Sequence, residues 1–200
     1  MSIFGKATPE RLTIFSDGVF AVLITVLVLE LHAPEEPFFE ALLSHWPALL
    51  SYAMSYLFIA IVWINHHYLL RYATEATPRL LWFNFAHLFS MSLVPLSTAW
   101  MATTRLAPQP VAFYGAVFFL VNATYVALIW ELCNHAGVPQ AVRKIMRLRA
   151  IVTLGLFAVG TITALKFPLA SIGMYLCCLI VYLRPEPPFA AKRATARRRK

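Results

Sequence analysis

The chain has 200 residues, of which 60% are hydrophobic and only 13% are charged. Its mean hydropathy of +0.68 is too high for a soluble globular protein and indicates an integral membrane protein. The formal net charge of +8 does not by itself indicate nucleic-acid binding, because basic residues also set the orientation of membrane proteins. The three cysteines lie in apolar runs, which argues against a disulfide framework or a metal-binding cluster.

Six apolar runs follow one another along the chain, and a helix needs about 20 residues to cross the hydrocarbon core of a bilayer. We place the runs at 13–31, 48–70, 80–103, 111–133, 149–165 and 168–183. The last two are short, and Lys166-Phe167-Pro168 between them indicates a tight turn. We therefore predict an all-α integral membrane protein with six transmembrane helices in one domain, residues 1–183. The first run lacks the cleavage site of a signal peptide, and we expect it to be retained.

The basic residues predict how these helices are oriented. With the N-terminus in the cytoplasm, all but two of the seventeen Lys and Arg residues fall on the cytoplasmic side, four of them in a loop over 143–149. This asymmetry satisfies the positive-inside rule and places both termini in the cytoplasm of a multi-pass protein of the cell (plasma) membrane. The basic tail, 184–200, is expected to be flexible and to contact anionic lipids. We expect no nucleic-acid partner for it.

The first run carries a stripe of small and apolar residues with one hydroxyl group. On a helical wheel, the members of this stripe lie within about 60° of a common centre line. They are Phe15, Gly18, Val22, Thr25, Val26 and Leu29. One interpretation is ordinary packing between membrane helices, for which such residues are well suited.

The other interpretation is the wall of a pore at the axis of a symmetric oligomer. Val22 and Leu29 would then form apolar constrictions, with the Thr25 hydroxyl groups as a polar ring between them. Phe15 and Gly18 would line a wider cytoplasmic vestibule. The residues of the stripe do not decide between helix packing and a pore wall.

Asp17 lies off this stripe and needs a partner, because a lone carboxylate in a helix bundle costs several kcal/mol. Arg11 lies six residues earlier on another face, so a simple ion pair within a regular helix is not expected. The other candidate partners are polar residues of the second and third runs. They are Asn65, His66, His67, Asn84 and His87, of which His66, His67 and Asn84 lie at the depth of Ser16 and Asp17. We predict a polar network that joins the first three helices at the inner leaflet, and a proton relay is the alternative.

Other classes of membrane protein lack support in the sequence. The fourth run has no basic residue, and the link between the last two is too short for a re-entrant filter loop, unlike a voltage-gated channel. No pair of runs matches as an inverted repeat. Adjacent residues such as His66 and His67 point about 100° apart on a helix, so we predict no metal site. No motif of a membrane enzyme is present, and we predict no cofactor.

Three motifs together resemble those of the transmembrane protein 175 family, whose animal member is an endolysosomal potassium channel. The first is R-x-x-x-F-S-D-G-V-F-A from Arg11 to Ala21, running on to Val28-Leu29-Glu30-Leu31. The others are W-x-x-H-H from Trp63 to His67 and N-x-x-x-L-F-x-x-S-L-x-P from Asn84 to Pro95. The resemblance covers roughly the first hundred residues closely and the remainder by topology alone.

The resemblance implies a potassium-permeable channel in which four copies of a six-helix chain assemble and their first helices line the pore. It places the hydrophobic constriction at Val22, which is smaller than the family's usual isoleucine or leucine, and the threonine ring at Thr25, near which potassium would pass. It also implies a structural polar network away from the ion path. The predicted network comprises Arg11, Ser16, Asp17, Trp63, His66, His67 and Asn84.

Two alternatives to the channel remain. One is a proton-coupled transporter that uses Asp17 and the histidines of the second run. The other is a non-conducting membrane assembly protein with a basic tail. Neither alternative is an enzyme.

Overall fold

The computed structural model of the chain describes residues 8–135 and 140–182, which form eight helices and no strand. The helices are α1 (Pro9–Leu29), α2 (Phe39–Ser44), α3 (Trp46–Leu70), α4 (Pro78–Ser92), α5 (Val94–Thr103), α6 (Pro108–His135), α7 (Gln140–Ala164) and α8 (Pro168–Tyr182). The all-helical fold predicted from the sequence is confirmed for this part of the chain.

Prolines and threonines fix where several helices begin. Proline lies in the first turn of α1, α3, α4 and α5, where its missing N–H group costs no helical hydrogen bond. Thr8 caps α1 by accepting a hydrogen bond from the Arg11 backbone N–H at 3.3 Å, and Thr77 caps α4 by accepting one from Leu80 at 3.1 Å. These prolines and capping threonines therefore fix the first residues of the helices.

Within the described ranges, five helical segments are long and apolar enough to cross a membrane. Four of them are α1, α3, α6 and α7, and the fifth combines α4 and α5 over Pro78–Thr103. The helix is interrupted at Leu93, since Pro95 has no N–H group to donate to the carbonyl oxygen four residues earlier. The sixth apolar segment, α8, has only 15 residues, about 22 Å of helix.

Two sequence expectations need correction. The segment 143–149, expected as a loop, belongs to α7, which begins at Gln140. Arginine, lysine, leucine and methionine are good helix formers, so the helix continues beyond its apolar part. The short helix α2 was not predicted, because its apolar run is too short to stand out. The expected turn between the last two runs is confirmed, and the Phe167 N–H donates to the Thr163 oxygen at 2.8 Å.

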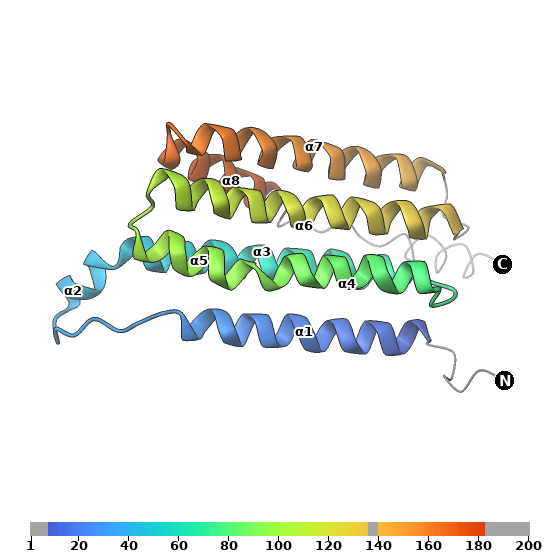
Figure 1. The fold of residues 1–200 in the computed structure, drawn as a ribbon, viewed down its shortest axis with the longest axis horizontal. Coiled ribbons are helices and arrows are strands. Elements are labelled where there is room, and N and C mark those ends of the chain that lie inside the picture. The colour runs from blue at the N-terminus through green and yellow to red at the C-terminus, as the bar shows by residue number, and fades with distance from the viewer. Residues whose placement is uncertain (1–7, 136–139, 183–200) are drawn as a thin grey trace, which may run out of the picture.

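The long helices run alongside one another in a bundle, with α1 at one edge and α7 and α8 at the opposite edge (Figure 1). The start of α1 and the connection between α3 and α4 lie at one end, whereas α2 projects beyond the other. The core is rich in stacked and tilted aromatic rings. Phe58 of α3 stacks on Phe118 of α6 with ring centroids 3.6 Å apart, and Phe157 of α7 contacts both edge-on. Burial of these rings holds the α3, α6 and α7 layers together.

Candidate functional site: the first helix and its polar contacts

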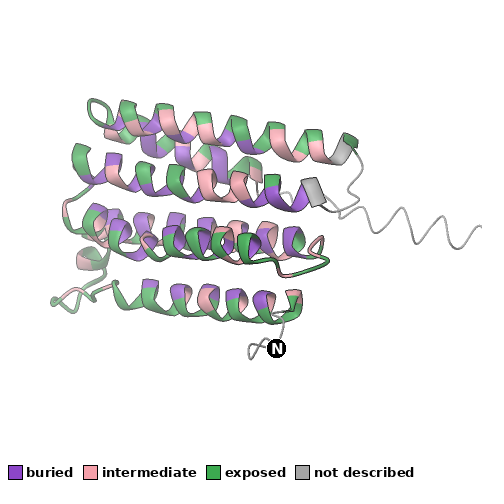
Figure 2. Ribbon diagram, turned by 45° about the vertical axis from the view of Figure 1, so that its right-hand side comes forward, coloured by how far each residue is buried: buried purple, intermediate pink, exposed green. Residues whose placement is uncertain are grey.

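Helix α1 buries only one narrow stripe against the rest of the bundle. That stripe consists of Leu12, Ser16, Phe20, Leu23 and Leu27. Its members recur every three or four residues, as expected for one face of a helix. The remaining surface of α1 is largely exposed, as Figure 2 shows along the edge helix. The helix therefore leaves most of its apolar surface uncovered by its own chain.

The stripe that the sequence singled out lies on this uncovered surface. Phe15, Val22 and Leu29 are 51%, 58% and 74% exposed, and Gly18, Thr25 and Val26 are exposed as well. Phe15 contacts Phe85 of α4 edge-on, with ring centroids 5.6 Å apart. The other members are exposed, so packing between helices of the same chain does not account for them. They face the bilayer or another copy of the chain.

Thr25 is the one hydroxyl-bearing member of this uncovered stripe. Its Oγ1 donates a hydrogen bond to the backbone oxygen of Val22 at 2.8 Å. Because the hydroxyl proton is used within the helix, the lone pairs of Oγ1 are left as acceptors on the exposed face. An oxygen with that arrangement can coordinate a cation but cannot donate a further hydrogen bond.

A chain of hydrogen bonds joins α1, α4 and α3 on the buried side. Asn84 Nδ2 donates to Ser16 Oγ at 3.0 Å, and Ser16 Oγ donates to the Leu12 backbone oxygen at 2.9 Å. His66 Nε2 lies 2.7 Å from Asn84 Oδ1 and donates to it, since an amide oxygen can only accept. All three polar side chains are buried, so each bond satisfies a group that water cannot reach.

His87 extends this group toward α6. Its ring stacks on His66, with centroids 5.4 Å apart and planes 9° from parallel. His87 Nδ1 lies 3.0 Å from the Thr124 hydroxyl oxygen, which also lies 3.0 Å from Ser90 Oγ. Thr124 and Ser90 were not identified from the sequence. Matching polar residues by depth across the fourth run would have found Thr124.

Asp17 belongs to a second group on a different side of α1. Trp63 Nε1 donates to Asp17 Oδ1 at 2.8 Å, and His67 Nδ1 lies 3.8 Å from Asp17 Oδ2. The Asp17 and His67 side chains are 35% and 34% exposed, so solvent weakens the electrostatic attraction between them. The structure thus separates Ser16 from Asp17, which pair with different residues of α3 and α4.

Arg11 is the member of the predicted network that the structure does not bring to the others. It lies exposed in the first turns of α1, and within the described ranges its side chain makes no hydrogen bond or ion pair. This agrees with its position on the helical wheel, which turns it away from Asp17. In a single subunit, the partners of the Asp17 carboxylate are therefore Trp63 and His67 of α3.

An ion pair at the end of the bundle where α4 begins was also missed. Arg79 Nε lies 2.9 Å from Glu131 Oε2, and the Glu131 side chain is 6% exposed. Comparing depth along the chain would have suggested this pair too, because Arg79 lies at the start of the third apolar run and Glu131 near the end of the fourth, at the same end of the bundle. Over residues 8–135 and 140–182, no group of three or more His, Cys, Asp and Glu side chains could hold a metal ion.

Comparison with known proteins identifies relatives of this chain. The sequence model of the family described as endosomal/lysosomal potassium channel TMEM175 matches residues 11–95. A potassium channel of Chryseobacterium sp. (strain P1-3) is 31% identical over 181 residues, which cover 90% of this chain and 94% of that relative. The human endosomal/lysosomal proton channel TMEM175 is 29% identical over 135 residues, 62% of this chain and 26% of the human protein.

A solved structure shows the same fold. The crystal structure of a lysosomal potassium-selective channel TMEM175 homolog from Chamaesiphon minutus aligns with a TM-score of 0.80 at 24% identity. The alignment covers 88% of this chain and 96% of that one. With the near full-length match to the Chryseobacterium relative, these findings show that the chain is a multi-pass membrane protein of the TMEM175 channel family, among its bacterial members.

Proposed function

We propose that the chain is the subunit of a homotetrameric cation channel that favours potassium over sodium modestly, with the exposed stripe of α1 lining a central pore. The observation that carries the proposal is the exposure of this stripe, from Phe15 to Leu29, at the edge of the bundle. Several relatives are named potassium channels, which supports the choice of ion.

The chemistry of the stripe suits an ion path without a filter loop. Val22 and Leu29 would form apolar necks at which a hydrated cation must shed part of its water. Thr25 lies between them, and the acceptor lone pairs of its Oγ1 would replace some of that water. Potassium loses its hydration shell more readily than sodium, so such a neck favours potassium without the strong selectivity of a carbonyl cage. Phe15 and Gly18 would line the wider cytoplasmic vestibule.

The proposal includes a topology of six membrane spans with both termini in the cytoplasm and no re-entrant filter loop. Helix α8 supplies the sixth span, as the short arm of a hairpin with α7. The distribution of basic residues supports this orientation. The proposed basic tail, 184–200, lies outside the described residues. We assign the assembly to the cell membrane.

A flux assay on purified protein in liposomes tests the proposed function. Wild-type protein should carry potassium down its gradient faster than sodium. Val22→Ala widens the apolar neck, and the sodium flux should rise several-fold, so that the ion ratio falls toward one. Val28→Ala is the matched control, because Val28 is an exposed valine of α1 that lies about 120° from Val22 on the helical wheel. Unchanged ion ratios in Val22→Ala would remove Val22 from the path.

A proton-coupled transporter is the second candidate, and the contact between Asp17 and His67 favours it. The two side chains are partly exposed, and His67 Nδ1 lies 3.8 Å from Asp17 Oδ2. Animal relatives are named proton channels. Single-channel current steps separate the candidates, because a transporter that changes conformation in each cycle is too slow to produce them. A non-conducting assembly protein would show no flux of either ion.

A further inference from the structure

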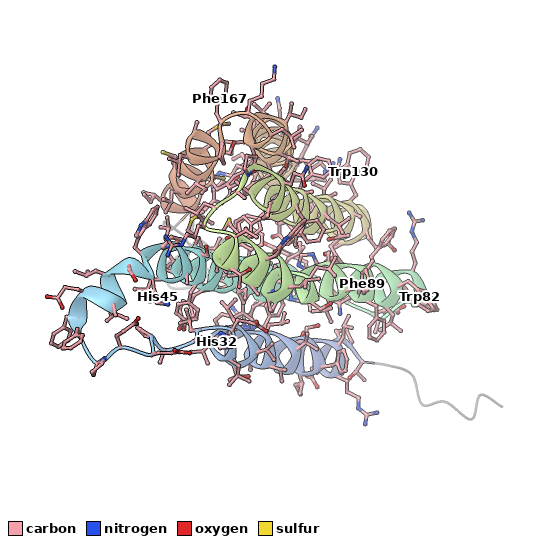
Figure 3. The ribbon with its side chains drawn as sticks, turned by 60° about the vertical axis from the view of Figure 1, so that its left-hand side comes forward. His32, His45, Trp82, Phe89, Trp130 and Phe167 are labelled. Atoms are coloured by element: carbon pink, nitrogen blue, oxygen red, sulfur yellow. The ribbon has the colours of Figure 1, made fainter. Side chains whose placement is uncertain are left out.

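The cytoplasmic start of α7 is strongly basic. Four of the seven residues over 143–149 are Lys or Arg, and the whole helix contains no acidic residue. Arg147 lies with its guanidinium 4.7 Å from the centre of the Trp130 ring of α6. Trp130 is 49% exposed and points away from the bundle (Figure 3), as tryptophans at a membrane interface do. The end of the α6–α7 pair therefore presents positive charge at the depth of lipid headgroups.

An apolar stripe continues along α7 directly below these charges. Its members are Leu148, Ile151, Val152, Gly155, Val159 and Ile162. All of them are exposed, and they recur at the spacing of one helical face. Lys144 precedes Leu148 by four residues, and Arg147 precedes Ile151 by four, so each cation lies one turn above an exposed aliphatic side chain.

The position of α7 in the bundle decides what covers this face. Helix α7 lies at the edge opposite α1 (Figure 1). If α1 faces the axis of a tetramer, as in the proposed function on which this step rests, α7 lies at the outer rim of the assembly. Its exposed face then meets lipid rather than a neighbouring subunit.

We propose that the outer face of α7, from Lys144 to Ile162, is a binding surface for an anionic phospholipid of the inner leaflet. Lys144 and Arg147 contact the headgroup phosphate, with Trp130 beside them at the interface. The acyl chains lie along the aliphatic stripe. Gly155 leaves room for them, since a side chain added there meets no atom within 4 Å. The excess of positive charge selects a net-negative headgroup over a zwitterionic one.

Native mass spectrometry of the purified protein tests this proposal, with phosphatidylglycerol and phosphatidylcholine added in equal amounts. Wild-type protein should retain phosphatidylglycerol preferentially. Lys144→Gln should weaken that retention about fivefold, the effect of one basic residue near an anionic surface. Lys166→Gln, which removes an exposed lysine at the opposite end of α7, is the control and should leave retention unchanged.

A second pair of variants tests the acyl-chain part of the surface. Gly155→Leu fills the space on α7 and should lower phosphatidylglycerol retention, whereas Gly173→Leu on α8, which is equally open, should not. Equal loss in the controls, equal retention of phosphatidylcholine, or a doubled mass from a second assembly docked on α7 would overturn the proposal. The same spectra report the number of subunits, and ion flux is measured separately, so failure of the lipid site is distinguishable from failure of the proposed channel.

Discussion

At the scale of single residues, two polar side chains that are neighbours in sequence have different surroundings. Ser16 is buried and joins Asn84 and His66, whereas Asp17 is partly exposed and joins Trp63 and His67. Adjacent residues on a helix point about 100° apart, which permits this division. Together, the two groups fix α1 to α3 and α4 without using the exposed stripe.

Asn84 is the residue on which the buried group depends, because it bonds to both α1 and α3. Asn84→Ala removes both hydrogen bonds and leaves His66 Nε2 and Ser16 Oγ without these partners in the bundle interior. We expect a loss of about 1–3 kcal/mol in stability, seen as a lower thermal unfolding temperature in detergent. Ser92→Ala, which alters an exposed serine of the same helix, should have little effect. An unfolding temperature equal to that of wild type would contradict the role of Asn84.

The bond between Trp63 and Asp17 can be isolated by a double-mutant cycle. Trp63→Phe removes the donor, Asp17→Ala removes the acceptor, and the combination should cost less than the sum of the single changes, by about 1 kcal/mol. Thermal unfolding of the four proteins measures this coupling, and additive effects would contradict the bond.

We also expect Asp17→Asn to lower the fraction of assembled oligomer more than it changes conductance. Normal assembly with altered conductance would place Asp17 in the ion path instead.

Much of this site could be predicted from the sequence, because the depth of each polar residue in the membrane follows from its position in its apolar run. Topology places polar residues of successive runs at the same level in the membrane, which predicts that Ser16, His66 and Asn84 lie together. Depth does not give direction around each helix, so the sequence left open which partner belongs to Asp17. It also left out Thr124, because depth was compared only across the first three runs.

At the scale of helices, the order and approximate bounds of the apolar runs could be predicted, but their details depend on backbone hydrogen bonds. Pro95 lies in the third apolar run, but a proline can either kink a helix or end it, and the structure shows a break at Leu93. The early start of α7 was missed because hydropathy marks the apolar part of a helix and not its polar extension.

Close approach of α7 and α8 depends on a glycine. A Cβ atom at Gly160 would lie 2.5 Å from Cε1 of the buried Tyr175 ring, so Gly160→Ala forces the ring or the helices apart. We expect a loss of about 1–3 kcal/mol, measured as a lower unfolding temperature. Gly155→Ala is the control on the same helix, where the added methyl group meets nothing and alanine favours the helix. Equal stability of both variants would contradict close packing at Gly160.

At the scale of the whole molecule, the arrangement of helices gives the two edges of the bundle different surfaces. Helix α1 lies at one edge with its apolar stripe uncovered, and α7 lies at the other with a basic end and an exposed aliphatic stripe. The sequence predicted which residues of α1 share a face, but not that the subunit leaves this face exposed. That depends on how helices far apart in sequence pack, which helical periodicity does not determine.

The central claim is that ions pass along the exposed stripe of α1, and cysteine substitution at Thr25 tests it most directly. In a Cys177→Ser background, which removes the exposed native cysteine among the described residues, Ag⁺ can reach Thr25→Cys only through the ion path. We predict that Ag⁺ in nitrate solutions blocks the potassium current of reconstituted Thr25→Cys channels and leaves Val28→Cys channels conducting. Persistent current through Thr25→Cys, or equal block of both variants, would contradict the account.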